Sequence, residues 1–358
     1  MDKYDVAIIG AGLYGAMCAY TERKKGKKVL VVDKSSHIGG MCHTDNINGI
    51  DVHCFGAHIF RTDNKKVWDF VNSVSKFVPF INTPIAVYGN EQYNLPFNMN
   101  TFRALFGCSS PSEAAKIIES TTVPCDDPQN LEEFVLSKVG TVIYEKLIKH
   151  YTEKQWGRKC SELPVSTMAR IPVRFTYNNN YYNVRWQGVC QNGYDYFISE
   201  LLKGCDILLG VDYKSDFSEI NSHACEIMYT GAIDELFDYE LGTLDWRAVR
   251  FETAILPDVD NKQGVAVMNY TDDRPYTRTI EHKHFTNKDC RGTVVSFEFP
   301  CETSATATPS YPIINERNKS LHNEYIAMSK AKFPNIKHGG RLGEYKYYSM
   351  DEIIEKFI

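Results

Sequence analysis

The sequence predicts an α/β fold in three interwoven parts, and three observations support it. A short apolar run leads directly into a G-x-G-x-x-G turn near the N-terminus. Helical spacing replaces strand patterns between residues 98 and 165, and segments that alternate aromatic or β-branched with polar residues dominate after residue 171. These patterns predict a Rossmann-like domain, a helical insertion and an antiparallel β-sheet domain.

The N-terminal segment predicts a binding site for a diphosphate. The expected strand Asp5–Ile9 is followed by Gly10, Gly12 and Gly15 and then by an apolar helical stretch. Gly10 permits the tight turn, Gly12 lets the backbone approach a pyrophosphate, and Gly15 lets helix and strand pack closely. The N–H groups and the positive dipole end of the helix then face the anion.

A second strand pattern and a glycine pair indicate which dinucleotide binds. Lys28–Asp33 ends in an acid 18 residues after Gly15, near the spacing of a carboxylate that binds a ribose 2′-hydroxyl. Gly39–Gly40 resembles the extended fingerprint of FAD-binding two-dinucleotide-fold flavoproteins rather than that of NAD dehydrogenases. Glu226–Gly231 and Gly339–Arg341 fit the same resemblance, because such proteins close the nucleotide domain with distant segments. We favour FAD over NAD.

Capping signals mark the helical insertion. Ser110–Glu113 is a capping box with Pro111 at the first helical position, and the helix continues through Ile118. Asn130 caps a second helix, whose apolar residues recur at three- and four-residue steps as far as Tyr151. Most of these apolar residues are expected to form the core of the insertion.

Strand patterns and the helical stretch together set the expected domain limits. The strands expected in the antiparallel sheet are Val173–Tyr177, Arg247–Thr253, Val265–Tyr270, Thr277–His282 and Thr293–Phe299. We expect an FAD-binding domain of residues 1–80, 193–240 and 330–358, a helical insertion with a mobile flap of residues 98–165, and a sheet domain of residues 81–97, 166–192 and 241–329.

Composition narrows the class of protein. With 358 residues, 43% of them hydrophobic, the chain is long enough for several packed layers. A net charge of −5 indicates neither nucleic acid nor an anionic membrane as partner, so local arginines must hold any bound anion. The 11 cysteines include no C-x-x-C pair and no metal-site spacing, which is typical of reduced, buried thiols. We see no leader and no apolar run of membrane-spanning length, so a cytoplasmic protein is expected.

Longer sequence blocks carry a more specific resemblance. The blocks are Tyr151–Arg158, Glu162–Pro164, Arg170–Thr176, Asn179–Tyr181, Gly56–Phe60, Tyr93–Phe102 and Gly339–Tyr348. Together they resemble the bacterial UDP-galactopyranose mutases, and the likeness runs from Met1 to Met350.

The resemblance implies a flavin-dependent isomerase that interconverts UDP-galactopyranose and UDP-galactofuranose, or the corresponding N-acetylgalactosamine pair. In that family N5 of reduced FAD attacks the anomeric carbon, UDP leaves, the sugar ring opens and recloses, and UDP returns without net oxidation. The resemblance also implies a UDP-sugar substrate, reduction of FAD by NAD(P)H or another donor, a homodimer, and a cytoplasmic role in cell-surface polysaccharide biosynthesis.

The resemblance further assigns roles to single residues. Arg170 and Arg247 match two arginines that bind the substrate diphosphate, and with His58 and Arg61 they form the implied catalytic set; guanidinium forks suit phosphate oxygens. The implied substrate-binding residues are Asn82, Tyr151, Thr152, Trp156, Arg170, Tyr181, Arg247, Asn269, Arg278, Tyr311 and Tyr347. The implied cofactor-binding residues are Gly10, Gly12, Leu13, Tyr14, Gly15, Asp33, Lys34, Gly39, Gly40, Met41, His58, Ile59, Val211, Thr230, Gly231, Arg341, Tyr347, Ser349 and Met350.

Two positions depart from the family pattern. Arg61 stands where the family usually has histidine, and a longer, permanently charged fork there suits a bulkier sugar 2-substituent, which makes UDP-N-acetylgalactosamine a candidate substrate. Ser349 stands where an aspartate is usual, so a negative charge near the diphosphate tyrosines is lost, although Asp351 is close by.

Other functions and other roles for these residues stay open. The chain could be an FAD-dependent oxidoreductase of the amine-oxidase or porphyrinogen-oxidase type, or a non-catalytic flavoprotein that binds nucleotide sugars. For Arg170 and Arg247 the alternative role is a surface ion pair, and for Trp156, Tyr181 and Tyr347 it is core packing.

Overall fold

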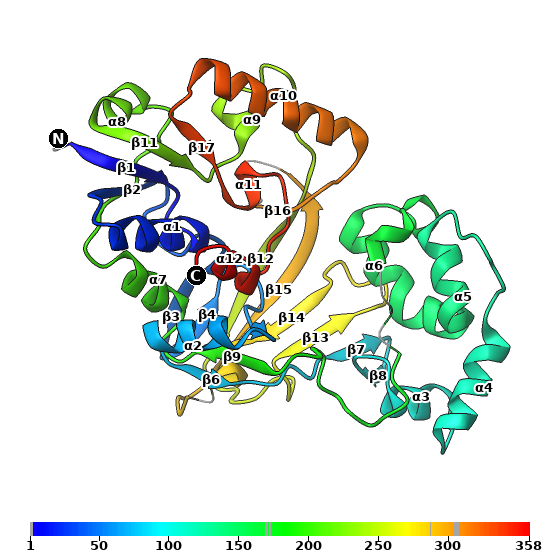
Figure 1. Ribbon diagram of the computed structural model, residues 1–358. Coiled ribbons are helices and arrows are strands. Elements are labelled where there is room, and N and C mark those ends of the chain that lie inside the picture. The colour runs from blue at the N-terminus through cyan, green and yellow to red at the C-terminus, as the bar shows by residue number, and fades with distance from the viewer. Residues whose placement is uncertain (1–2, 169–170, 172, 287, 304–307) are drawn as a thin grey trace.

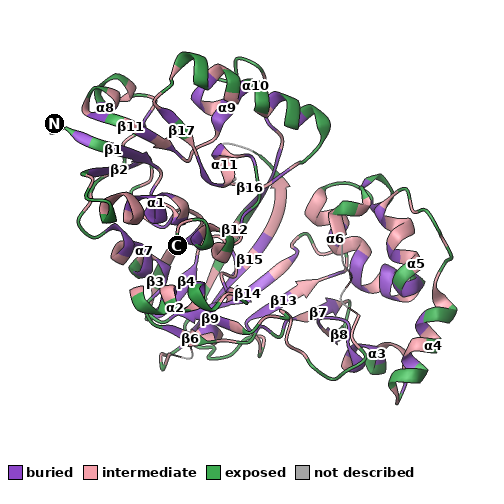
Figure 2. Ribbon diagram, viewed as in Figure 1, coloured by how far each residue is buried: buried purple, intermediate pink, exposed green. Residues whose placement is uncertain are grey.

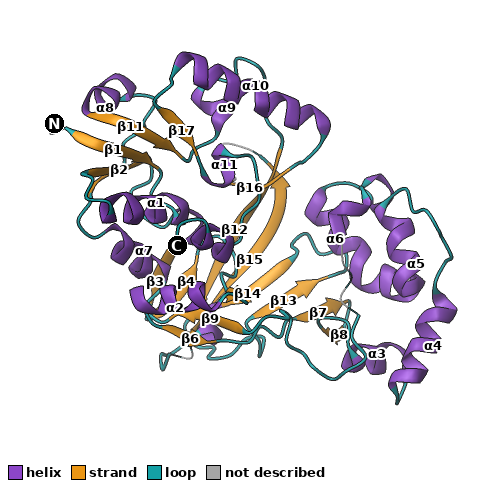
Figure 3. Ribbon diagram, viewed as in Figure 1, coloured by secondary structure: helices purple, strands orange, loops and turns teal. Residues whose placement is uncertain are grey.

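Two large sheets and a group of helices make up the fold (Figure 1). The computed structural model describes residues 3–168, 171, 173–286, 288–303 and 308–358. Figure 3 shows helices around one sheet and a separate group of helices at one end of the other. The predicted α/β fold with a helical insertion is confirmed.

A five-stranded parallel sheet forms the nucleotide-binding part. In spatial order its strands are β10 (Asp206–Leu209), β2 (Val29–Asp33), β1 (Tyr4–Ile9), β11 (Ala224–Tyr229) and β17 (Ile336–His338). Every neighbouring pair in it is parallel. Segments far apart in the sequence therefore meet in this sheet.

Helices cover both faces of the parallel sheet, as parallel strands require. Along β1, Val6 and Ile8 face one apolar cluster, and Ala7 and Ile9 face the other. The first cluster is covered by α1 (Leu13–Lys24), α2 (Lys65–Val74), α7 (Tyr194–Leu202) and α12 (Met350–Glu355). The second is covered by α8 (Phe217–His223), α9 (Ile233–Leu236) and α10 (Glu316–Lys332). Figure 2 shows β1 mostly buried and much of α10 exposed.

Helix α10 extends this layer beyond the expected limit. Leu321 and Tyr325 are buried in the same cluster as Tyr229 and Ile336. The Tyr325 hydroxyl also donates to the Gly242 carbonyl at 2.6 Å. The last segment of the nucleotide-binding part thus begins with α10, whereas the sequence-based limit is residue 330.

A seven-stranded sheet forms the second part. Its order is β16 (Thr308–Pro312), β12 (Trp246–Leu256), β15 (Thr293–Glu302), β14 (Arg278–Glu281), β13 (Val267–Tyr270), β7 (Ile85–Tyr88) and β8 (Glu91–Asn94). Neighbouring strands are antiparallel except β13 and β7, which are parallel, so the antiparallel expectation is corrected at that pair. Two small sheets pair β3 (Thr44–Ile47) with β4 (Ile50–His53), and β9 (Trp186–Cys190) with β5 (Phe60–Thr62) and β6 (Phe77–Pro79).

The predicted strand Val173–Tyr177 is wrong. Val173 makes only an isolated bridge to Phe97. The Arg174 guanidinium donates to the carbonyls of Asn180 at 2.5 Å and Tyr181 at 3.4 Å. Side-chain donors thus satisfy loop carbonyls here, and a segment with the composition of a strand follows an irregular path.

The helical insertion consists of α3 (Met99–Phe106), α4 (Pro111–Thr121), α5 (Leu131–Ile143), a π-helical turn (Tyr144–Lys149) and α6 (His150–Trp156). Its apolar core includes Leu131, Val135, Val139, Ile143 and Leu147. The predicted caps are largely confirmed, because Ser110 and Asn130 each accept a hydrogen bond from the third residue of their helix. The capping box at Ser110 is incomplete, since the Glu113 carboxylate accepts from the N–H of Ser109 instead.

The cysteines are less uniformly buried than expected. All 11 are free. Those that are buried are Cys18, Cys42, Cys108, Cys160 and Cys190, whereas Cys225 is exposed. Among the described residues, no helix has both the length and the apolar composition needed to cross a bilayer.

Candidate active site

The glycine turn and the Gly39–Gly40 pair lie side by side. Gly12 and Gly39 form a parallel bridge, and the Gly39 N–H donates to the Ala11 carbonyl at 3.0 Å. Gly10 has a φ of +110°, and a Cβ on Gly15 would lie 1.9 Å from the Gly10 carbonyl oxygen. Neither Gly10 nor Gly15 therefore accepts a side chain.

This arrangement fits the diphosphate of an adenine dinucleotide. Gly12 is the N-cap of α1 and provides no side-chain cap, so the first N–H groups of the helix are available to an anion. A Cβ on Gly12 would contact only backbone of Gly39 and Gly40, at 3.6 Å or more. Side chains of the described residues thus leave the space above Gly12 free. We call Gly10–Gly15 with Gly39–Gly40 the glycine cradle.

We expect Gly12→Ala to lower FAD retention by about tenfold or more without unfolding the protein. The added methyl meets the Gly40 Cα at an ordinary contact distance of 3.6 Å, but it fills the space through which a phosphate approaches the backbone. Visible flavin absorbance per protein measures retention, and thermal unfolding of flavin-free protein is the control. Retention equal to that of the parent would contradict this role for Gly12.

Other predicted cofactor residues surround the cradle. Thr230 donates through Oγ1 to the Ile9 carbonyl at 2.7 Å. A Cβ on Gly340 would lie 3.4 Å from Tyr14 and 3.6 Å from Thr230. The Asp33 carboxylate accepts from the N–H of Ala11 at 2.6 Å, so it stabilises the turn and keeps lone pairs for a ribose hydroxyl.

The remaining predicted cofactor residues occupy nearby elements. Lys34 pairs with Glu235 at 3.2 Å, and the Val211 N–H donates to the carbonyl of Asp33 at 3.1 Å. The others lie at the start of α1 (Leu13), in a 3₁₀ turn (Met41), in the core (Ile59), after β11 (Gly231) and at the start of α12 (Met350).

Arg278 on β14 is the centre of the predicted substrate site. Its Nε and Nη2 donate to one carboxylate oxygen of Glu298 on β15, at 3.1 and 2.7 Å. The Arg278 side chain is 26% exposed, whereas that of Glu298 is 2% exposed. Burial raises the pKa of Tyr151 and that of Tyr311, and the positive charge of Arg278 opposes both shifts. The positive charge of Arg278 thus acts on the hydroxyl of Tyr151 from α6 and on that of Tyr311 from β16. We call Arg278, Glu298, Tyr151 and Tyr311 the Arg278 cluster.

A second guanidinium links this cluster to the glycine cradle. Arg341 of α11 (Gly340–Gly343) lies over the ring of Tyr347 at 4.4 Å, and Tyr347 stacks on Tyr311 at 5.8 Å. Arg341 also donates to the carbonyls of Ser310 and Tyr348, at 2.9 and 3.0 Å. Because Arg341 directly follows Gly340, the tyrosine stack adjoins the cradle.

Arg247 on β12 is directed at the end of α6. It is 7% exposed, and burial lowers its pKa. Its Nε donates to the carbonyl of Gln155 at 3.0 Å and its Nη2 to that of Lys154 at 3.3 Å. A Cβ on Gly157 would lie 2.8 Å from Nη1, so the glycine after α6 makes room for the guanidinium. Arg170, the other predicted diphosphate arginine, lies outside the described residues.

Two predicted asparagines are buried near the cluster. Asn82 is 5% exposed, and its carbonyl accepts from the N–H of Tyr181 at 2.9 Å. Asn269 is paired in register with Arg278, and its Oδ1 is buried with no hydrogen-bond partner in the described part of the chain. A buried acceptor of this kind needs a donor from a ligand or a water molecule.

Three predicted residues lie on the insertion side of the site. Trp156 and Tyr181 are partly buried against the apolar core of the insertion, and Thr152 is 3% exposed. Tyr181 also packs edge-on against Tyr182 at 5.2 Å. Core packing therefore accounts for the buried part of Trp156 and Tyr181, and the part of each side chain that stays exposed can contact a substrate.

The two departures from the family pattern lie together. Arg61 and Ser349 line the same surface hollow, and the Arg61 guanidinium lies 4.2 Å over the ring of Tyr182. Ser349 is the N-cap of α12 and forms a capping box with Glu352, in which the Ser349 N–H donates to the Glu352 carboxylate at 2.8 Å. Aspartate and serine are both preferred N-caps, so serine at this position retains the capping role.

Three histidines form a hydrogen-bonded chain beside the site, and His53 and His282 in it are buried. The His58 N–H donates to Nδ1 of His53 at 3.1 Å, and the His53 N–H donates to Nδ1 of His282 at 3.2 Å. Burial lowers the pKa of His58 to about 4 and that of His282 to about 3, and it also holds the pKa of His53 well below its usual value. His58 is therefore neutral beside the arginines at physiological pH.

We expect these three linked histidines to make the free energy of unfolding depend on pH. Below pH 6.5 an unfolded histidine takes up a proton that the folded one does not, so the free energy of unfolding falls as the pH drops. Each histidine contributes about 1.4 kcal/mol per pH unit. Chemical denaturation between pH 7 and 4.5 should show a shallower slope in His282→Gln than in the parent. Equal slopes would contradict the buried, neutral state of His282.

Comparisons with known proteins identify the family. A match to the family described as UDP-galactopyranose mutase covers residues 146–347, and one to the NAD(P)-binding Rossmann-like domain covers residues 8–74. The dTDP-fucopyranose mutase of Escherichia coli is 36% identical over 99% of this chain and 96% of its own length. This chain belongs to the UDP-galactopyranose mutase family. The probable UDP-galactopyranose mutase of Klebsiella pneumoniae is 34% identical, over 99% and 93% of the two chains.

Solved structures share the fold of this UDP-galactopyranose mutase family member. A crystal structure of reduced UDP-galactopyranose mutase covers 99% of this chain and 92% of its own, with a TM-score of 0.73 at 12% identity. A putative protoporphyrinogen oxidase from Exiguobacterium has a TM-score of 0.66 at 13% identity, over 98% and 96% of the chains. The fold is therefore shared with oxidases, while the family match makes this chain a flavin-dependent mutase.

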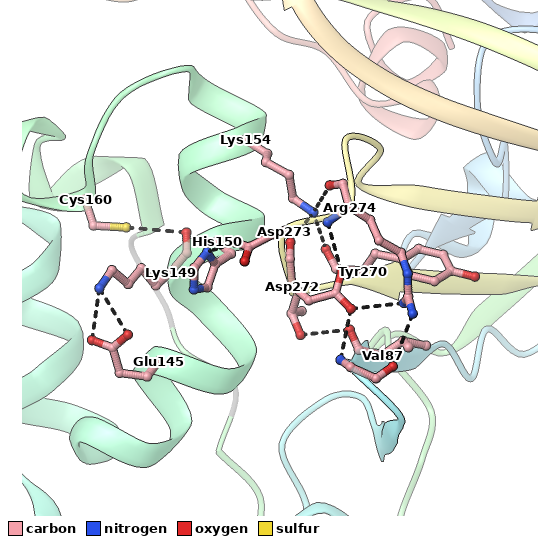
Figure 4. Close-up of polar contacts among 12 residues, drawn as sticks. Val87, Glu145, Lys149, His150, Lys154, Cys160, Tyr270, Asp272, Asp273 and Arg274 are labelled. Carbon is pink, nitrogen blue, oxygen red and sulfur yellow. Dashed lines mark hydrogen bonds and ion pairs between the residues drawn. The ribbon is translucent and has the colours of Figure 1, made fainter.

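Two residues of this mutase family member are prominent in the structure but were not predicted. Glu298, the partner of Arg278, is a lone acid between Phe297 and Phe299, and a charge within an aromatic strand is the one sequence signal for it. Lys154 points from α6 into the connection between β13 and β14 (Figure 4). It belongs to the Tyr151–Arg158 block, but its spacing gives no sign of its contacts.

Proposed function

We propose that the protein interconverts the pyranose and furanose forms of a UDP-linked galactose-type sugar with reduced FAD. The observation that carries this proposal is the continuity between the glycine cradle and the Arg278 cluster. Gly340 contacts the cradle, and Arg341 extends from it to Tyr347 and Tyr311. A diphosphate-binding cofactor and an anionic nucleotide sugar can thus bind next to each other.

The residues of the chain would bind FAD, orient the nucleotide sugar and stabilise the departing UDP. The glycine cradle and Asp33 would hold FAD, which when reduced supplies a nucleophilic nitrogen for the anomeric carbon. Arg278 and Arg247 offset the charge that develops on the departing UDP, and Arg170 is assigned the same role from the family pattern. The hydroxyls of Tyr181, Tyr311 and Tyr347 orient the diphosphate, Tyr151 and Thr152 hold the uridine, and Trp156 lies beside the sugar. His58, which stays neutral, adds no charge next to the flavin.

The nature of the sugar is a separate part of the proposal. Arg61 over Tyr182 supports acceptance of UDP-N-acetylgalactosamine, because the guanidinium can donate to an N-acetyl oxygen. The 36% identity to dTDP-fucopyranose mutase makes a thymidine-linked 6-deoxy sugar a second candidate.

A substrate panel tests these assignments. The reduced protein is incubated with the furanose forms of UDP-galactose, UDP-N-acetylgalactosamine and dTDP-fucose, and the pyranose products are separated by chromatography. Conversion of a UDP-sugar supports the proposal, whereas conversion of dTDP-fucose alone would reassign the nucleotide. Conversion of none of the three would refute it.

Further parts of the proposal concern the setting. We propose that NAD(P)H or another donor reduces the FAD. We also propose that the protein is a homodimer and that it works in the cytoplasm. Its 11 free thiols support the cytoplasmic location, because thiols stay reduced there. Anaerobic bleaching of the flavin by NADPH tests the reductant, and light scattering tests the homodimer.

A further inference from the structure

The side chain of Lys154 ends inside a ring of backbone oxygens. Its Nζ donates to the carbonyls of Tyr270 at 2.9 Å, Asp272 at 2.8 Å and Arg274 at 2.8 Å, residues that Figure 4 labels. It also donates to the carbonyl of Tyr276 at 3.1 Å. An ammonium group has three N–H donors, so four convergent carbonyls use its full capacity. We call these four oxygens the carbonyl ring.

The charge of Lys154 is retained in this ring. Burial lowers its pKa to about 8, while Asp272 and Asp273 oppose the shift, so the side chain is an ammonium at neutral pH. His150, one turn earlier on α6, adds an ion pair from Nδ1 to Asp273 at 3.0 Å. Asp273 has a 94% exposed side chain, so this second contact is weak.

The carbonyl ring connects the two walls of the candidate site. Lys154 lies on α6 between Tyr151 and Trp156, and the ring belongs to the connection between Asn269 on β13 and Arg278 on β14. The backbone carbonyl of Lys154 accepts a hydrogen bond from Nη2 of Arg247 at 3.3 Å. Lys154 is thus bound at its backbone to β12 and at its side chain to the β13–β14 connection.

We propose that Lys154 is a positioning residue that fixes α6 against the β13–β14 connection, so that the nucleotide meets a preformed wall; this inference rests on the proposed function. Helix α6 does not depend on Lys154 for folding, because the apolar core of the insertion and Arg247 also hold it. Loss of the ammonium group should therefore loosen the site rather than unfold the chain.

The test compares Lys154→Met with Lys149→Met in the FAD-loaded protein. Lys149 is the matched control, because it lies about one turn and a half earlier and, among the described residues, its ammonium pairs within its own segment, with Glu145 at 3.0 Å. Isothermal titration should show UDP binding weakened about 10- to 100-fold in Lys154→Met and changed by about twofold at most in Lys149→Met. UDP affinity equal to that of the parent in Lys154→Met would overturn the proposal.

Chemical rescue separates the ammonium contact from a general packing effect. In Lys154→Ala, propylammonium replaces the missing atoms and should restore UDP affinity, whereas tetramethylammonium, which has no N–H donor, should not. Failure of propylammonium to restore affinity would also overturn the proposal. If the parent itself does not bind UDP, the proposed function fails. Hydrogen exchange of the α6 amides then decides the positioning role, which requires faster exchange in Lys154→Met than in Lys149→Met.

Discussion

Replacing Arg247 with alanine is expected to lower kcat/KM for the nucleotide sugar by about 10²- to 10³-fold. Arg247 is 7% exposed, and its guanidinium is held at the end of α6 by the carbonyls of Lys154 and Gln155. A fixed, poorly hydrated positive charge stabilises a departing diphosphate more than a mobile surface charge does. Steady-state kinetics with the reduced enzyme measure the effect.

Arg250 provides the matched control for this prediction. It lies on the same strand β12, but its side chain is 45% exposed and pairs with Glu252. Arg250→Ala should leave kcat/KM nearly unchanged. Arg247→Lys should recover only part of the activity, because the compact, strongly hydrated ammonium does not reproduce the fixed planar fork of the guanidinium. A loss of tenfold or less in Arg247→Ala would contradict the role assigned to this guanidinium.

The second large effect is expected at Glu298. Glu298→Gln should lower the free energy of unfolding by about 3 kcal/mol or more, since it leaves the Arg278 charge without its buried partner. The pair is joined by bonds of 2.7 and 3.1 Å, and the Glu298 side chain is 2% exposed. Urea denaturation of the flavin-free protein measures the change.

An exposed ion pair and a double variant serve as controls. Asp258 pairs with Arg291 at 2.7 Å, but their side chains are 79% and 82% exposed, so Asp258→Asn should cost at most about 1 kcal/mol. Replacing both members, as in Arg278→Met with Glu298→Leu, should regain stability but not activity. If Glu298→Gln costs no more than Asp258→Asn, the pair does not organise the site.

The features that the sequence predicts correctly depend on local constraints. Gly15 must be glycine because its own turn brings the Gly10 carbonyl within 1.9 Å of any Cβ. The caps at Ser110 and Asn130 involve residues three positions apart, so their sequence pattern is sufficient. The family blocks lead to the family that the comparisons show, because their order along the chain does not depend on contacts.

The features that the sequence does not predict depend on contacts between distant segments. The pairing of Arg278 with Glu298 requires the register of β14 against β15, and the carbonyl ring around Lys154 requires α6 to meet another domain. The segment Val173–Tyr177 has the composition of a strand, but among the described residues its ladder pairing is limited to the isolated bridge between Val173 and Phe97. Tertiary context decided these three cases.

The central claim is that reduced FAD and the Arg278 cluster together isomerise a nucleotide sugar without net electron transfer. The most direct measurement is an anaerobic incubation of the dithionite-reduced protein with UDP-galactofuranose, in which chromatography follows the sugar and absorbance follows the flavin. The account predicts many turnovers to the pyranose form while the flavin stays reduced, and none with the oxidised protein. Turnover that consumes one reduced flavin per sugar, or conversion that is equal in both redox states, would contradict it.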